Sequence, residues 1–220
     1  MKKHVTHKKV TTSHFFREGI LLTEYTPPKQ SRAKETEERF LQALNTLLHQ
    51  HSFQQTSIKD IAKEAHLTKA AFLKRFGSKE IALIKLYELY CKEAHQTMDS
   101  LIAQLEKYTT VQQCMNSVVE KYESLILKHF ASNRAMQEQF QLNLEVHPLT
   151  KSIFQHCIQM MTQIQEHFAI KGSKTGAYAG AQLLVTLVYN HCLQATPALP
   201  KNTKDRQELI ADIIILTLKR

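Results

Sequence analysis

The residues best suited to chemistry are cations in one short stretch, "TSIKDIAKEAHLTKAAFLKRFGSKE", which runs from Thr56 to Glu80. The cations in question are Lys59, Lys69, Lys74, Arg75 and Lys79. Lys and Arg hold phosphate oxygens through charge-assisted hydrogen bonds, and neutralising a polyanion also releases its counterions. The stretch therefore indicates a surface for a phosphate backbone. A cationic face that only keeps a helix in solution is the alternative interpretation.

Two short helices joined by a tight turn are expected to position these cations. Ser57 can cap the first helix, with Asp60 three residues on to complete a capping box. Thr68 can cap the second helix, and Ser78 can cap the helix that follows it. The pattern thus predicts three helix starts within about twenty residues.

The second of these helices has an apolar side and a cationic side. Phe72 and Phe76 are predicted core residues that hold it against the rest of the domain. Ala70 and Ala71 are small, so the helix can approach base edges and thymine methyl groups. A short turn followed by an exposed basic helix indicates a helix-turn-helix, whose second helix enters the major groove of DNA.

The stretch resembles the DNA-binding signature of the TetR family of bacterial transcriptional regulators, roughly T-T-h-x-D-I-A-x-x-A-G-V-S-x-G-x-h-Y-x-x-F-x-S-K-E with h apolar. The resemblance extends upstream to "TEERFLQALNTLLHQHSF". It implies that three parts of this stretch contact DNA: Lys59, the recognition helix and Lys79, which would contact phosphate. The residues of the recognition helix are Thr68, Lys69, Ala70, Ala71, Leu73, Lys74 and Arg75. It also implies a double-stranded operator, a homodimer and an unknown small-molecule effector.

The chain departs from the family's usual residues at several positions. His66 and Ser52 stand where the pattern has Gly, and the Gly of the recognition helix is Ala70. Leu73 replaces the aromatic Tyr, which removes a hydroxyl and a stacking ring. His66 tolerates a positive φ less well than Gly does. These changes bear on the geometry and sequence preference of DNA binding, and the fold expectation stands.

The fold class expected is all-α: an N-terminal three-helix helix-turn-helix domain followed by a larger helical domain for ligand binding and dimerisation. Helical periodicity recurs over about residues 31–50, 78–98, 111–125, 148–168, 174–195 and 204–219. Only 5 Gly and 5 Pro are available for turns, which also favours long helices. The domains predicted are a basic extension (1–30), the DNA-binding domain (31–80) and the larger domain (81–220).

Charge and composition narrow the class of protein. Residues 1–81 carry 15 Lys and Arg against 8 Asp and Glu, whereas positive and negative charges nearly balance over residues 82–220. A polyanion partner is therefore expected for the N-terminal part of the chain alone. No glycine-rich phosphate loop, HExxH or nucleophile elbow is present, so we expect no enzyme, cofactor or metal. No apolar run could span a bilayer, and the four scattered cysteines indicate reduced core residues of a cytoplasmic protein. The resemblance to the TetR family further implies association with the bacterial nucleoid.

The larger domain is expected to sense a small molecule, although the same residues could be ordinary core. Candidate ligand-binding residues are Tyr122, Phe140, Phe154, Cys157, Met161 and Tyr178. The last two helices, with small and aliphatic faces, are expected to pair with those of a second copy. The alternative is a TetR-like DNA-bound factor that acts by binding another protein, such as a nucleoid-occlusion inhibitor of cell division, without a small-molecule inducer.

The N-terminal extension is basic and contains a double proline, Pro27–Pro28, near its end. Its cations, together with Arg32 just beyond it, are Lys2, Lys3, Lys8, Lys9, Arg17 and Lys29. An arm tethered here could reach phosphates or a minor groove. The alternatives are an unstructured leader or a start codon placed too early, and the apolar "HFFREGILL" could instead be structural.

Overall fold

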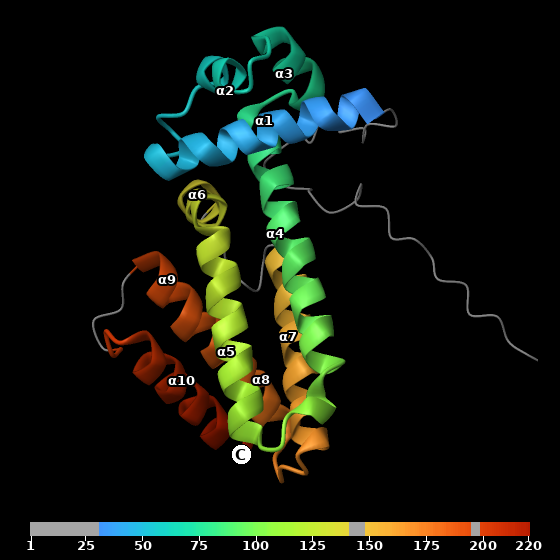
Figure 1. Cartoon of the computed structure of the whole chain (residues 1–220), viewed down its shortest axis with the longest axis vertical. Helices are drawn as coiled ribbons and strands as arrows, with labels where there is room; N and C mark the ends of the chain where they lie inside the picture. Colours follow the sequence, from blue (N-terminus) through green and yellow to red (C-terminus); the bar gives the residue numbers. More distant parts are fainter. Residues whose placement is uncertain (1–30, 141–147, 195–198) are drawn as a thin grey trace, which may run out of the picture.

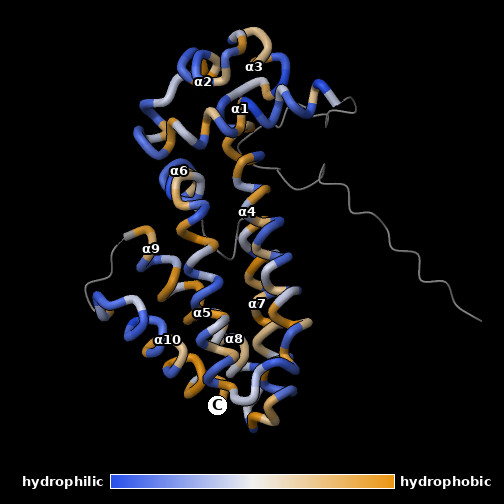
Figure 2. Tube along the Cα trace, viewed as in Figure 1, coloured by the Kyte–Doolittle hydropathy of each residue, from blue (hydrophilic) through white to orange (hydrophobic). Residues whose placement is uncertain are grey.

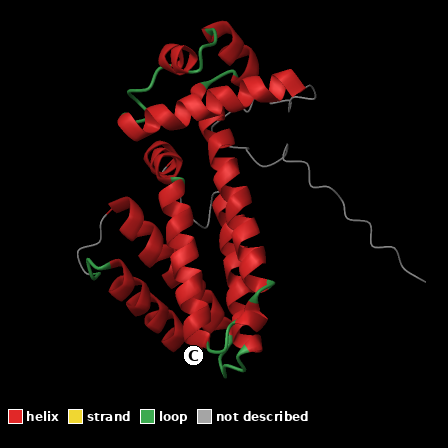
Figure 3. Cartoon of the chain, viewed as in Figure 1, coloured by secondary structure: helices red, strands yellow, loops and turns green. Residues whose placement is uncertain are grey.

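A computed structural model describes residues 31–140, 148–194 and 199–220 of the chain. Within these residues the regular structure is entirely helical, as predicted (Figure 3). The helices are α1 (Ser31–Gln50), α2 (Ile58–Glu64), α3 (Lys69–Phe76), α4 (Lys79–Ile102), η2 (Leu105–Lys107), α5 (Val111–Lys128), α6 (Phe130–Phe140), α7 (Pro148–His167), α8 (Lys174–Leu184), η3 (Val185–Tyr189), α9 (Asn190–Gln194) and α10 (Thr203–Leu218). The N-terminal extension lies outside the described residues.

Helices α1, α2 and α3 form a small domain at one end of the molecule (Figure 1). Phe40 of α1 meets Phe72 and Phe76 of α3 edge-on, with ring centroids 5.2 and 6.1 Å apart. All three rings are buried, which confirms the prediction that Phe72 and Phe76 hold α3 down. Edge-to-face aromatic packing fixes the angle of α3 on α1, because the ring quadrupoles favour that geometry.

The predicted helix caps are present. Ser57 and Asp60 form the reciprocal capping box of α2. The side chains of Thr68 and Ser78 accept hydrogen bonds from the first turns of α3 and α4. His66, which replaces the turn glycine of the family pattern, does adopt a positive φ of 52°.

Arg39 of α1 stabilises the turn between α2 and α3. Its guanidinium donates to the carbonyl of Ala65 at 2.6 Å and to that of His66 at 3.4 Å. Those carbonyls lie at the C-terminal end of α2, where the helix leaves acceptors without internal partners. The charged donor therefore helps to hold the strained turn that positions α3.

Helix α4 runs from the small domain into a larger helical body (Figure 1). Hydrophobic residues recur at each turn along α4, α5 and α7 and form the core of this body (Figure 2). Cys91, Cys114 and Cys157 are buried in the core and Cys192 is half-buried, all with free thiols, in agreement with the prediction of reduced core cysteines.

The face of α8 that carries small residues packs against α10 of the same chain. This corrects part of the expectation that this face contacts a second copy. Gly180 is buried against α10, and a Cβ added to it would lie 2.9 Å from Leu218 Cδ2. Ala177 and Ala181 are buried on the same face. These small residues let α8 and α10 approach closely, so they are not free to form the contact with a second copy that the sequence suggested.

A buried ion pair joins α5 to α10. Arg206 Nη2 donates to Glu123 Oε1 at 2.6 Å, and Gln207 donates to the other carboxylate oxygen at the same distance. Arg206 also bonds the carbonyls of Pro200 and Lys201 ahead of α10. Satisfying both charges in this way allows the pair to be buried and sets how α10 lies on α5.

Candidate nucleic-acid interface and ligand cavity

The outward side of α3 carries most of the residues that the sequence associates with DNA. Thr68, Lys69, Ala70, Leu73 and Lys74 are exposed. The inward side holds Phe72 and Phe76, so the helix is anchored by its aromatic face and presents its cationic and small residues to solvent. Lys59 is exposed on the neighbouring α2, and Ala71 is half-buried at the edge of the exposed side.

Two of these residues have distinct roles at the surface of α3. Thr68 accepts a hydrogen bond from the amide of Ala71 at 3.1 Å, so its hydroxyl oxygen already caps the helix. Leu73 is 39% exposed, although it is large and apolar. An exposed leucine at this position can contact the methyl group of thymine but cannot donate a hydrogen bond.

Arg75 has a partner within the protein, which the sequence did not predict. Its Nη1 lies 3.6 Å from a carboxylate oxygen of Glu37 on α1, and its side chain is only 18% exposed. The pair ties the C-terminal half of α3 to α1. Arg75 therefore has a structural role in addition to the DNA contact that the family pattern implies.

Lys79 links the start of α4 to the turn that follows α1. Its ammonium donates to the carbonyls of Phe53 at 2.9 Å and Thr56 at 3.1 Å. It also lies 4.4 Å from the centre of the Phe53 ring. Two of its three N–H donors are used inside the domain. The sequence interpretation, which gave Lys79 only to phosphate, misses this contact because the partners lie more than 20 residues away.

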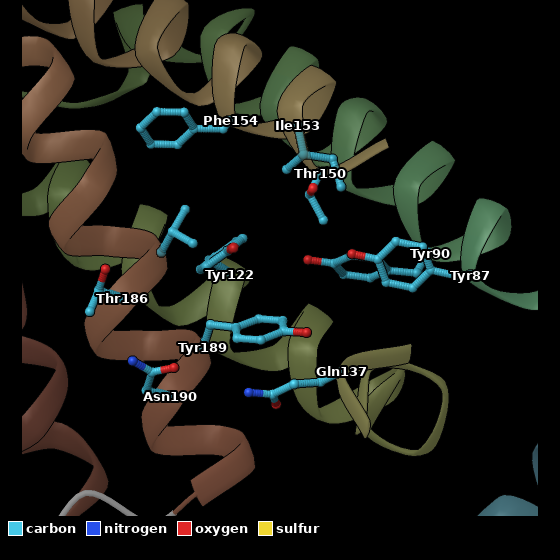
Figure 4. Close-up of a pocket in the computed structure, with 11 residues that line it drawn as sticks. Tyr87, Tyr90, Tyr122, Gln137, Thr150, Ile153, Phe154, Thr186, Tyr189 and Asn190 are labelled. Atoms are coloured by element: carbon cyan, nitrogen blue, oxygen red, sulfur yellow. The ribbon is translucent and has the colours of Figure 1, made fainter. Parts of the chain in front are cut away.

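A cavity of about 120 Å³ lies within the body, between α4, α5, α6, α7 and η3 (Figure 4). Its lining residues are Tyr87, Tyr90, Tyr122, Gln137, Thr150, Ile153, Phe154, Val185, Thr186, Tyr189 and Asn190. We call it the tyrosine cavity. Its walls combine apolar surface with a few converging polar groups, which is the usual composition of a small-molecule site.

The candidate ligand residues named from the sequence are only partly brought together. Tyr122 and Phe154 line the tyrosine cavity, and Cys157 lines a much smaller one beside it. Met161 is fully buried in the core and lines neither cavity. Tyr178 is 43% exposed and meets Phe154 edge-on from outside, at 5.3 Å between ring centroids. The side chain of Phe140 lies outside the described residues.

The sequence reasoning missed three tyrosines of the cavity. Tyr87 and Tyr90 lie three residues apart on α4, and Tyr189 lies on η3, about a hundred residues later. Aromatic residues at helical spacing look like core in a sequence, and only the tertiary fold, which places α4 and η3 around one cavity, brings these hydroxyls together. The repetition of Tyr on one helix was the available signal.

The tyrosine hydroxyls lie in a strongly desolvated place. Burial raises the pKa of Tyr87, Tyr90, Tyr122 and Tyr189 above the ordinary tyrosine range. The hydroxyls of Tyr90 and Tyr122 hydrogen-bond one another. The hydroxyl of Tyr189 is buried and has no hydrogen-bond partner among the described residues. A buried polar atom without a partner costs free energy, and a bound molecule could supply the missing bond.

A π-helical turn forms one wall of the cavity. Residues Val185–Tyr189 follow α8 directly and lead directly into α9. Val185, Thr186 and Tyr189 come from this turn, and Asn190 follows it. Such turns are uncommon and often occur at functional sites, because they change the direction in which successive side chains point.

The described residues thus form a helix-turn-helix with an exposed basic recognition helix, joined to a helical body that contains a cavity. The family model of bacterial regulatory proteins of the tetR family matches residues 40–82, which include α2, α3 and the start of α4. Residues 40–82 therefore form the DNA-binding domain of the tetR family, as the sequence predicted, and this is a domain of transcriptional regulators and not of enzymes.

Solved structures show that the similarity in fold extends beyond this domain. A TetR-family regulator from Mesorhizobium loti is 12% identical, with a TM-score of 0.64 and coverage of 86% of this chain and 97% of that chain. PfmR, a TetR-family regulator from Thermus thermophilus, is 16% identical, with a TM-score of 0.61 and coverage of 83% and 100%. A TetR/AcrR-family regulator from Thermobifida fusca, at 16% identity, gives a TM-score of 0.61 and coverage of 84% and 98%.

A search of curated proteins by sequence found no match. Across residues 31–140, 148–194 and 199–220, no group of three or more His, Cys, Asp or Glu side chains could hold a metal ion. In the same part of the chain, no helix has the length and apolar character needed to cross a membrane.

Proposed function

We propose that the protein is a homodimeric repressor that binds a palindromic operator and releases it when a small molecule enters the tyrosine cavity. It would act on the nucleoid in the bacterial cytoplasm, with domains at residues 31–80 and 81–220. The proposed DNA-contacting surface consists of Lys59, Thr68, Lys69, Ala70, Ala71, Leu73 and Lys74. Arg75 and Lys79, which the family pattern also assigns to DNA, are proposed to contribute mainly by holding the domain together. The exposed basic side of α3 supports this assignment.

The observation that carries the proposed regulation is that α6 lines the tyrosine cavity and also contacts α1 of the DNA-binding domain. Arg134 of α6 donates to the carbonyls of Leu48 and His51 at the C-terminal end of α1, at 2.7 and 3.2 Å. Gln137, one turn later on α6, lines the tyrosine cavity. A molecule that shifts α6 would therefore shift the helix on which α3 is packed. Differential affinity for two arrangements of α6 is what allostery requires.

The coupling can be tested without knowing the effector. Thr186→Phe would fill part of the cavity permanently, and we expect it to weaken operator binding at least 5-fold, within the usual range of coupling between sites. Arg134→Met removes the link to α1, so the double variant should bind operator as the Arg134→Met variant alone does. Thr186→Ser is the matched control, because it enlarges the cavity slightly instead of filling it.

Operator fragments selected from the source genome supply the DNA for these measurements, and circular dichroism checks that each variant is folded. Equal losses of affinity for Thr186→Phe with and without Arg134→Met would contradict coupling through α6. Unchanged affinity in every variant would contradict the sensor function itself and favour the alternative of a DNA-bound protein-interaction factor. The presence of the tyrosine cavity supports the sensor over that alternative.

The dimer is proposed from the outer faces of α8 and α10. Leu209 and Leu216 of α10 are exposed, Leu216 by 65%, and Tyr178 is exposed on α8. Large exposed apolar side chains on two helices that pack against each other favour an isologous contact with a second copy. Sedimentation equilibrium at micromolar concentration should give twice the chain mass of 25.4 kDa. Leu216→Glu should shift it toward the monomer, whereas Leu127→Glu, on the exposed side of α5, should not.

A further inference from the structure

The size of the tyrosine cavity restricts what can enter it. Its volume is about 120 Å³. An apolar cavity of about 150 Å³ holds one benzene molecule, and a water molecule has a share of about 30 Å³ in the liquid. The cavity therefore corresponds to a few waters or to one compact molecule with a single six-membered ring.

The direction in which the tyrosine hydroxyls point restricts the chemistry of the ligand further. In Figure 4 the hydroxyl ends of Tyr87, Tyr90 and Tyr189 point toward the same central space, and their rings stand behind them. A cation would be attracted to aromatic ring faces, but these tyrosines present their hydroxyl edges. Hydroxyl edges donate and accept hydrogen bonds. The arrangement suits a hydroxyl or carbonyl group on the ligand.

The Tyr189 hydroxyl indicates where the hydroxyl or carbonyl group of the ligand would lie. Its hydroxyl is buried and has no partner among the described residues, whereas the hydroxyls of Tyr90 and Tyr122 bond one another. Gln137 and Asn190 line the cavity on the same side as Tyr189 (Figure 4). Ile153, Phe154 and Val185 supply apolar wall for a ring.

We propose that the effector is a compact uncharged molecule, about the size of a single aromatic ring, whose hydroxyl or carbonyl oxygen hydrogen-bonds the Tyr189 hydroxyl. This inference rests on the proposed sensor function and names the class of molecule that the cavity selects. Ionised ligands are disfavoured, because the surrounding groups are buried and moving a charge out of water into such a place is costly. The raised pKa of the cavity tyrosines reports the same penalty on negative charge.

Four probes that share one ring test the class. They are benzyl alcohol, toluene, benzoate and benzylammonium, and titration calorimetry on the full-length protein at pH 7.5 measures their binding. Benzyl alcohol should bind at least 10-fold more tightly than benzoate or benzylammonium. It should also bind roughly 3- to 10-fold more tightly than toluene, which corresponds to one net hydrogen bond.

Tyr189→Phe is the diagnostic variant, since it removes only the unpartnered hydroxyl. It should weaken benzyl alcohol binding roughly 3- to 10-fold and leave toluene binding within 2-fold, so that the two ligands become nearly equal. Tyr108→Phe is the matched control: it removes a hydroxyl outside the cavity, bonded to Ser117, and should leave all four affinities unchanged.

Each contrary result has a definite meaning. Tighter binding of benzoate or benzylammonium, equal binding of toluene and benzyl alcohol to the unmodified protein, or no binding of any probe at millimolar concentration would overturn the proposed ligand class. Operator affinity is measured in parallel with benzyl alcohol at saturation. Tyr189-dependent binding without any change in operator affinity would leave the ligand class standing and contradict the proposed effector function.

Discussion

Replacing Lys79 by Met separates the two roles that this residue can have. The structure gives its ammonium two carbonyl partners, Phe53 at 2.9 Å and Thr56 at 3.1 Å, and places it over the Phe53 ring at 4.4 Å. A hydrogen bond to a charged group contributes about 1.5–3 kcal/mol, and an exposed cation–π contact about 0.5–1 kcal/mol. Because Lys79 is half-buried and water can replace part of these contacts, we expect a loss of about 2–3 kcal/mol in the free energy of unfolding.

Urea unfolding followed by circular dichroism measures that loss, and the salt dependence of operator binding measures the other role. A lost phosphate contact lowers the slope of log affinity against log salt by about 0.9. Lys74→Met is the matched control, since Lys74 is exposed on α3. It should change the free energy of unfolding by less than about 0.5 kcal/mol and lower the salt slope by about 0.9 for each lost contact.

The two variants should therefore differ in opposite ways: Lys79→Met lowers stability with little change in slope, and Lys74→Met lowers the slope with little change in stability. A Lys79→Met variant as stable as the unmodified protein, with a slope lowered as much as in Lys74→Met, would refute the structural role. It would restore the simpler assignment of Lys79 to phosphate that the family pattern implies.

Three further predictions concern other parts of the molecule. Burial and the neighbouring His156 lower the pKa of His95 in the folded protein, so the unfolded chain takes up this proton first as the pH drops. The contribution of His95 to the free energy of unfolding should therefore be full above pH about 6.5 and be lost below it. His95→Gln should reduce the difference between the free energies of unfolding measured at pH 7.5 and pH 5.5. Gly180→Ala should cost up to about 2 kcal/mol, because the added methyl group meets Leu218 Cδ2 and the gain of about 1 kcal/mol in helix propensity offsets only part of the strain. A thermal midpoint that does not fall would show that the Leu218 side chain can move aside to admit the methyl group. Deleting residues 1–26 should leave the helical content intact and lower the salt slope by several units if the basic arm binds DNA, whereas equal slopes would exclude the arm.

Local features of the small domain were predictable because their causes lie within a few residues. A capping box depends on positions three apart, so Ser57 and Asp60 could be paired from the sequence. The burial of Phe72 and Phe76 follows from their spacing on one face of α3. The family pattern fits the same residues, and the solved structures extend the likeness to the body at identities below 20%.

The sequence by itself determined most of the helical segments and which short stretch presents a basic helix, since both depend on local spacing and capping. It did not predict α6 (Phe130–Phe140), which the structure shows. Tertiary structure alone decided the partners of Arg75 and Lys79, the use of Gly180 against α10, and the meeting of Tyr87 with Tyr189. These outcomes depend on which helix faces pack together. Many pairings of amphipathic helices bury similar apolar area, so the choice among them is made by contacts between residues far apart in the chain.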